Sequence, residues 1–234
     1  MNRIKSSIPY ILTLSLLIIT IVLGSYFDDL YKNEKLKETQ VYIYPVVKTF
    51  IMPDDVVKIM NIKDSTIKRI DIDSLERILE QNGYIDNAEV YRDLNGRLVA
   101  DVEQYKPIAR FIGQTSYYLD ENGNRKPLSK HYTEKVVLVY GEMYSGQKEK
   151  LKDLIKQIYN DKQLNEIVSE IHLNGKKIYL KTGKLSAGIN INLNEDIPEQ
   201  LYKLKAIYSY LIKQNLTEKY RQIDLQFENQ AVCK

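Results

Sequence analysis

Residues 85–104, IDNAEVYRDLNGRLVADVEQ, contain the clearest fold signal in the chain. Apolar and polar residues alternate over 88–92 and again over 98–104, a pattern typical of half-buried β-strands. Asn95 and Gly96 lie between the two runs, and an Asn-Gly pair tolerates the positive φ angles of a tight turn. This stretch therefore predicts a β-hairpin.

Two short helices are predicted immediately before the hairpin. Pro53 suits a first helical position, because the amide that proline lacks would be unpaired there in any case. A second helix is predicted to begin at Asp73, whose carboxylate caps the helix while Glu76 reaches back, and to end at Gly83. An alternating run at 41–47 precedes both helices, and its Pro45 favours an edge strand because proline cannot donate to a ladder. The predicted order is β-α-α-β-β over residues 41–107.

The remaining residues, 108–234, predict a second domain with both strands and helices. Strands are expected at 136–140, 167–173, 177–182 and 185–193, with a hairpin turn at Asn174-Gly175. Helices are expected at 147–161 and over a longer segment with Pro198 near its start, and a single terminal strand is expected over 222–232. The fold class is α+β, with an antiparallel sheet and packed helices in this second domain.

The N-terminus predicts a membrane anchor. Residues 8–27 carry no charge, and as a helix rising about 1.5 Å per residue they would span about 30 Å, the hydrocarbon thickness of a bilayer. Arg3 and Lys5 precede the segment and Asp28 follows it, so the positive-inside rule leaves residues 1–7 in the cytoplasm. Residues 28–40 would form a stalk. The alternative is a cleaved signal peptide, whose apolar region is usually shorter and whose small-x-small cleavage site is matched poorly here.

Composition excludes several classes of function. The net charge is +3, but Arg3 and Lys5 precede the first acidic residue, so residues 28–234 are nearly neutral and nucleic acid is not an expected partner. The single cysteine, Cys233, excludes a disulfide framework. His131 and His172 are the only histidines and lack further ligands at metal-site spacing. We expect no catalytic site, no metal and no cofactor, and hence a protein that is not an enzyme.

Several motifs in order resemble the FtsQ/DivIB cell-division family. They are the anchor, the β-α-α-β-β unit with residues 85–92 and 98–104, the stretch Lys106-Pro107-Ile108-Ala109, the turn in residues 118–123 and the terminal residues 223–232. The version most similar to this chain is that of Gram-negative, Bacteroidetes-type bacteria. The resemblance implies a POTRA domain at 41–107 and a β domain at 108–234. Gln226 and Phe227 depart from the arginine and tyrosine that are common in the family.

The resemblance also implies a function and its partners. It describes a bitopic scaffold of the bacterial divisome in the cell inner membrane, with a periplasmic C-terminal part at the division septum. A terminal strand at a sheet edge can pair with an extended segment of another protein, which is β-augmentation. By similarity, that strand recruits FtsB/FtsL-like bitopic partners and, through them, the septal peptidoglycan synthase complex. The implied partner contacts are Tyr220, Ile223, Leu225, Phe227, Asn229, Ala231 and Val232.

Two alternatives stay open on the sequence alone. Alternation along a strand places one set of side chains in the core, so Ile223, Leu225 and Phe227 can be core residues instead of partner contacts. A POTRA-containing factor for outer-membrane protein assembly or secretion is the alternative function, although such proteins usually carry several POTRA units or a transmembrane barrel. An envelope hydrolase would need a nucleophile-base or paired-acid arrangement that the sequence does not show.

Overall fold

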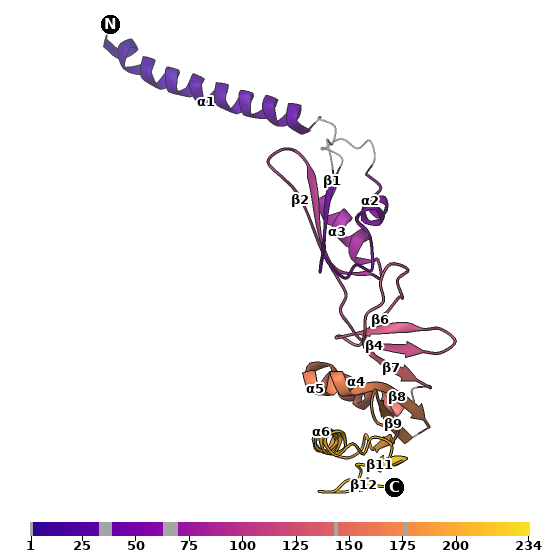
Figure 1. Ribbon diagram of the computed structural model, residues 1–234. Helices are drawn as coiled ribbons and strands as arrows, with labels where there is room; N and C mark the ends of the chain where they lie inside the picture. Colours follow the sequence, from indigo (N-terminus) through magenta and orange to yellow (C-terminus); the bar gives the residue numbers. More distant parts are fainter. Residues whose placement is uncertain (1, 33–38, 63–69, 143–144, 176) are drawn as a thin grey trace. The chain divides into compact units, whose positions relative to one another are not determined.

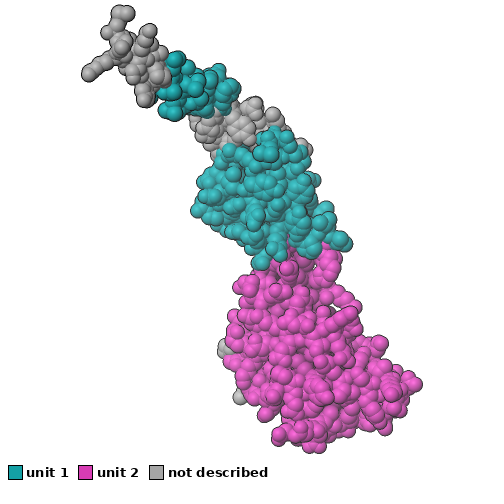
Figure 2. Space-filling view, turned by 90° about the vertical axis from the view of Figure 1, so that its left-hand side faces the viewer, with its two compact units in different colours: residues 1–47, 51–103 teal, residues 48–50, 104–234 magenta. Residues whose placement is uncertain are grey.

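The computed structural model describes residues 2–32, 39–62, 70–142, 145–175 and 177–234 (Figure 1). The chain divides into two compact units, shown in different colours in Figure 2. Unit 1 comprises residues 1–47 and 51–103, and unit 2 comprises residues 48–50 and 104–234.

The chain begins with the helix α1 (Asn2–Lys32). Its side chains are described over residues 12–27, where all of them are exposed. The hydroxyls of Ser15, Thr20 and Ser25 each donate to a carbonyl three residues earlier, so these polar groups are satisfied within the helix. No helix in the described part of the chain meets the length and apolarity of a membrane span. The predicted transmembrane helix at residues 8–27 is therefore not found in the described part of the chain. Residues 33–38 of the predicted stalk lie outside the described residues.

Unit 1 has a three-stranded sheet with two helices on one face. The elements are β1 (Thr39–Tyr44), α2 (Pro53–Met60), α3 (Ile72–Glu80), β2 (Ile85–Arg92) and β3 (Leu98–Gln104). The strand order is β1-β3-β2, and β1 runs parallel to β3 with Thr39 opposite Leu98 and Tyr44 opposite Glu103. The predicted β-α-α-β-β order and hairpin are confirmed. The predicted edge position of the first strand is confirmed as well, because β1 is the last strand on one side of the sheet, although it ends at Tyr44 and does not include Pro45.

The helix starts of unit 1 differ in part from the prediction. Pro53 lies in the first turn of α2, as predicted. In α3 the capping residue is Asp71, not Asp73, because Asp71 has an extended backbone and its carboxylate accepts a hydrogen bond from the Ser74 amide at 3.2 Å. Glu76 does not reach back to the helix start. Its Oε1 instead accepts a hydrogen bond from the Val90 amide on β2 at 2.7 Å, which joins the helix to the sheet.

Unit 2 is built on one nine-stranded sheet, with the order β12-β11-β10-β9-β8-β7-β4-β5-β6. Most of the strands precede α6: β4 (Pro107–Ile112), β5 (Tyr117–Asp120), β6 (Arg125–Lys126), β7 (Val137–Tyr140), β8 (Val168–Asn174), β9 (Lys177–Thr182) and β10 (Gly188–Ile191). The helices are α4 (Lys148–Asn160), α5 (Lys162–Ile167) and α6 (Ile197–Lys213), with a 3₁₀ turn at Ser145–Gln147.

The sheet of unit 2 is mixed, not antiparallel as expected. The pairs β4–β7, β7–β8 and β10–β11 are parallel, while β4–β5, β8–β9 and β9–β10 are antiparallel. For the pairs β7–β8 and β10–β11 the reason is topological. The helices α4 and α5 connect β7 to β8, and α6 connects β10 to β11, and a helical crossover returns the chain in the same direction. The predicted hairpin turns at residues 118–123 and at Asn174-Gly175 are confirmed.

The core of unit 2 lies between the sheet and its helices. It contains Leu151, Leu154 and Ile158 from α4 together with Leu201 and Leu204 from α6, all at most 3% exposed. These residues repeat at helical spacing, which places them on one side of each helix. The opposite face of the sheet carries a row of stacked rings, in which His172 lies between Tyr140 and Tyr179 with centroids 4.8 Å apart on each side. The His172 ring also bonds Glu170, two residues earlier on β8, and its cross-strand partners are Tyr140 and Tyr179.

Candidate partner-binding edge

The C-terminal segment forms two short strands, not one. They are β11 (Gln222–Asp224) and β12 (Val232–Cys233), which pair antiparallel with Ile223 opposite Cys233 and Asp224 opposite Val232. Asn229, in the connection between them, has a φ of 56°, which allows the chain to turn back. The predicted continuous strand over 222–232 is therefore wrong. The sequence alternates as a strand would, but the chain reverses direction within it.

This reversal places β11 inside the sheet. On one side β11 runs parallel to β10, with Ile189 opposite Ile223 and a hydrogen bond of 3.1 Å from the Leu225 amide to the Asn190 carbonyl. On the other side it is covered by β12. The strand at this edge of the sheet is consequently β12, only two residues long.

The pairing of β12 determines which of its backbone groups face outward. Gln222 and Lys234 exchange both of their backbone hydrogen bonds, at 3.1 and 2.9 Å. In an antiparallel pair the residues alternate between bonding to the neighbour and pointing away from it. The amides and carbonyls of Ala231 and Cys233 therefore point away from β11. These are the groups that an added strand would bond.

The predicted partner contacts fall into three groups in the structure. Ile223 and Leu225 are fully buried and belong to the core of unit 2. Phe227 is 49% exposed and Asn229 is exposed, while Tyr220, Ala231 and Val232 are half-buried. The structure thus brings Ala231 and Val232 to the sheet edge, puts Phe227 and Asn229 in the adjoining loop, and removes Ile223 and Leu225 from any surface.

Two residues of α6 that the sequence did not single out hold this loop. Glu199 Oε1 accepts a hydrogen bond from the Asn229 amide at 3.1 Å, and Lys203 Nζ donates to the Phe227 carbonyl at 2.6 Å. Glu199 and Lys203 are also ion-paired with each other at 3.1 Å. Their spacing of four residues on a helix indicates such a pair, but nothing in the sequence indicates the loop contacts. We call Glu199 and Lys203 the loop clamp.

The loop clamp predicts a pH dependence of the loop. The pKa of Glu199 lies below its ordinary value of 4.5. The main cause is the hydrogen bond from the Asn229 amide, and the hydrogen bond from Lys203 is the second. A carboxyl group whose pKa is lowered by folding stabilises the folded loop at any pH above its ordinary pKa. This stabilisation is lost as the pH falls through the lowered pKa. We expect the Asn229 amide resonance to titrate below pH 4.5 in an NMR pH series. Glu199→Gln should abolish that titration, and a titration that persists in this variant would assign it to another group.

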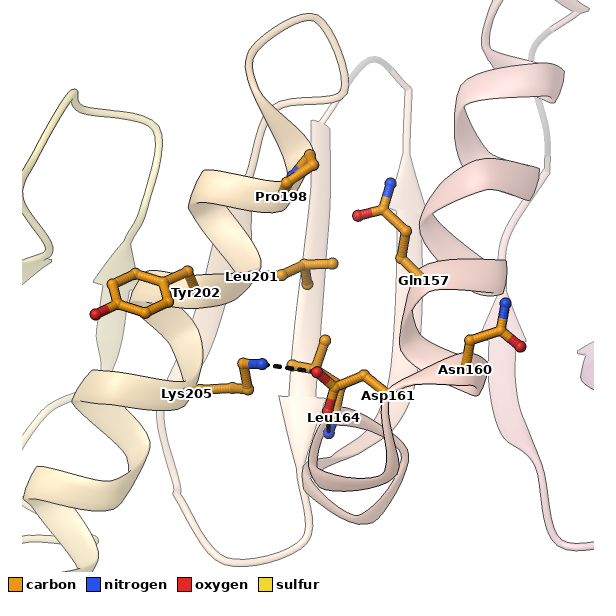
Figure 3. Close-up of a pocket in the computed structure, with 8 residues that line it drawn as sticks. All are labelled: Gln157, Asn160, Asp161, Leu164, Pro198, Leu201, Tyr202 and Lys205. Carbon is orange, nitrogen blue, oxygen red and sulfur yellow. Dashed lines mark hydrogen bonds and ion pairs between the residues drawn. The ribbon is translucent and has the colours of Figure 1, made fainter.

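A second feature of the helical face is a hollow of about 550 Å³ bordered by α4, α5 and α6 (Figure 3). Leu164 and Leu201 line its apolar part, and Lys205 pairs with Asp161 at 2.6 Å beside them. The Lys205 ammonium and the Leu164 amide lower the pKa of Asp161, whose carboxylate also caps α5. These charges are thus used in structural contacts. Within the described residues there is also no group of three His, Cys, Asp or Glu side chains arranged to hold a metal.

The comparisons with known proteins identify the family. A model described as FtsQ/DivIB, C-terminal related, matches residues 106–234, which is more than half of the chain. The chain belongs to the FtsQ/DivIB, C-terminal related family. A second model, described as a POTRA-like domain, matches residues 45–103 and therefore most of unit 1.

The searches of curated proteins and of solved structures add less to the FtsQ/DivIB assignment. No curated protein matches the chain. Among solved structures, the chain is similar to the major extracytoplasmic domain of the trans isomer of the bacterial cell division protein DivIB from Geobacillus stearothermophilus. The identity is 18% and the TM-score 0.29, over 47% of this chain and 96% of the other.

Membership in the FtsQ/DivIB family supports a role in bacterial cell division. The proteins of this family are non-enzymatic scaffolds that take part in division protein complexes, which is consistent with a chain that is not an enzyme. The expected α+β class, with a POTRA-like domain followed by a large sheet, is confirmed.

Proposed function

We propose that this chain is a bitopic scaffold of the divisome in Bacteroidetes-type bacteria. It links early and late division proteins at the septum. Its partners are FtsB/FtsL-like bitopic proteins and, through them, the septal peptidoglycan synthase complex. The observation that carries the proposal is the open edge of β12 in a domain of the FtsQ/DivIB family.

The mode of binding is β-augmentation at β12. An extended partner segment bonds the outward amides and carbonyls of Ala231 and Cys233. Phe227, Asn229 and Val232 contribute side-chain contacts from the loop and the strand, and Tyr220 lies just before β11. In this proposal Ile223 and Leu225 act indirectly, because they anchor β11 in the core and so position β12 beside it.

The N-terminal segment is the membrane anchor in this proposal, with the folded units in the periplasm. Its support is the uncharged stretch at 8–27 with basic residues before it and acidic residues after it. The described side chains of α1, residues 12–27, are all exposed, as the side chains of a helix that faces lipid would be. In cells, the full chain should accordingly remain in the membrane fraction after a wash at alkaline pH.

The proposal that a partner binds at the edge of β12 is tested by removing the outward amide donors of Ala231 and Cys233. Proline is tolerated on an edge strand where its missing amide faces away from the neighbour. In the double variant Ala231→Pro/Cys233→Pro, we expect the FtsB/FtsL-like partners recovered with the full chain from membranes to fall at least about tenfold, since both outward amides are gone. Cells that depend on this variant should form filaments that fail to constrict.

The matched control is Ala231→Ser/Cys233→Ser, which changes the same side chains but keeps both amides. It should recover partners at the wild-type level. Hydrogen exchange of the residues in β11 establishes that the proline variant retains its fold. Wild-type partner recovery by a folded proline variant would rule out β12 as the binding edge.

A further inference from the structure

Three tyrosines lie on the face of the unit 1 sheet that is opposite to α2 and α3. Tyr42, Tyr44 and Tyr91 are 48%, 49% and 44% exposed. Ile43 on β1 and Val90 on β2 belong to the core beneath the helices. Because side chains alternate along a strand, the neighbouring tyrosines point to the other face. We call Tyr42, Tyr44 and Tyr91 the tyrosine patch.

Acidic residues of β3 lie among these rings. Asp101 is opposite Tyr42 in the parallel register, and Glu103 is opposite Tyr44. The Tyr91 hydroxyl donates to Asp101 Oδ2 at 3.2 Å, which places β2 beside the same carboxylate. Glu89, two residues before Tyr91, is exposed on the same face. The tyrosine patch is therefore surrounded by negative charge.

The charge of Asp101 is not neutralised by the described residues. Its Oδ1 is buried and has no hydrogen-bond partner among them. Burial and the Asp101 carboxylate raise the pKa of Tyr91, as expected for a phenol held beside an anion. Val99, which alternation places on this face, is only 4% exposed. The face thus has a buried valine, exposed aromatic rings and a carboxylate that forms no ion pair with the described residues.

We propose that the tyrosine patch is a docking surface for an extended, arginine- or lysine-rich segment of a partner protein. Cations bind to the faces of tyrosine rings and to carboxylates, and this surface offers both. Basic side chains at alternate positions of an extended segment are about 6.6 Å apart, which matches the spacing of Tyr42 and Tyr44 along β1. The chain already contains such a contact, because the Arg125 guanidinium lies 4.5 Å from the centre of the Tyr117 ring.

The charge of the patch selects the class of partner. Anionic lipids and nucleic acids would be repelled by Asp101, Glu103 and Glu89, whereas a basic protein segment is attracted. The tyrosine patch belongs entirely to unit 1, and no residue of β12 takes part in it. It is therefore independent of the β12 edge, and either proposal can fail without the other.

The test measures binding of a fluorescent nonapeptide of alternating arginine and serine to the full chain in a non-ionic detergent. The comparison peptide has citrulline in place of every arginine, which keeps the shape and removes the charge. We expect the arginine peptide to bind with an affinity that falls as salt is added, and the citrulline peptide to bind at least tenfold more weakly. The variants Tyr42→Ser/Tyr91→Ser and Asp101→Asn should each weaken the arginine peptide at least tenfold.

Tyr202→Ser/Tyr210→Ser is the matched control, since it makes the same change at two tyrosines of α6 that are 70% and 54% exposed. It should leave peptide affinity unchanged, as should Ala231→Pro/Cys233→Pro. Asp101→Asn is close to isosteric and keeps the test decisive if the double tyrosine variant unfolds. Equal binding of the two peptides, or unchanged affinity in a folded Asp101→Asn variant, overturns the proposal.

Discussion

Replacing Ile223 by alanine should destabilise unit 2 by about 2–5 kcal/mol, the range measured when buried isoleucine or leucine side chains are truncated. Ile223 is fully buried and lies on β11 between β10 and β12, so its truncation leaves a cavity where the core meets the edge of the sheet. The loss should be measured by urea unfolding of the full chain, with hydrogen exchange assigning the change to peptides from residues 104–234.

Phe227→Ala separates stability from partner binding. Phe227 is 49% exposed, and surface substitutions usually change stability by no more than about 0.5 kcal/mol. This variant should unfold at nearly the wild-type urea concentration and yet recover less partner. A large stability loss in Phe227→Ala together with a small one in Ile223→Ala would contradict the burial described above.

Replacing Phe50 by alanine should destabilise unit 2 by about 3–5 kcal/mol, because a buried phenylalanine is lost from an aromatic cluster. Phe50 is 3% exposed and stacks on Tyr105 with a centroid distance of 4.6 Å. The rings of Tyr118 and Tyr132 meet it edge-on, at 5.8 and 5.3 Å. Its amide donates to the Gln104 side chain, and its carbonyl accepts from the Ser129 hydroxyl.

The effect of Phe50→Ala should appear in the second unit although the residue lies early in the chain. We expect faster hydrogen exchange in peptides that contain Tyr105 and Tyr118. Val47→Ala is the matched control, since Val47 is close in sequence but 89% exposed, and its exchange should equal that of the wild type. If exchange in those tyrosine peptides were unchanged by Phe50→Ala, residues 48–50 would not belong to unit 2.

Local patterns in the sequence predicted the elements that depend on neighbouring residues. The hairpin at 85–104 and the start of α2 at Pro53 are confirmed, because turn residues and first-turn residues act within a few positions of themselves. The cap of α3 was misplaced by two residues because Asp71 and Asp73 both suit that position. Only the backbone conformation selects Asp71.

The candidate site depended on interactions between distant residues. Residues 222–232 alternate as one strand would, and alternation alone does not reveal where a chain turns back. The position of the turn depends on three tertiary features. They are the pairing of β11 with β10, the reversal at Asn229 and the hydrogen bonds of the loop with Glu199 and Lys203. The same contacts separate Ile223 and Leu225, which are buried, from Ala231 and Val232 at the edge.

By itself, the sequence determined the β-α-α-β-β order of unit 1 and the hairpin turns at Asn95-Gly96, at residues 118–123 and at Asn174-Gly175. These follow from side-chain periodicity and turn chemistry, which act over a few residues. The tertiary structure decided which strands are parallel, that β12 is the edge, and that Phe50 joins the second unit. Those features depend on which distant segments bury each other's apolar surface, and no local pattern contains that information.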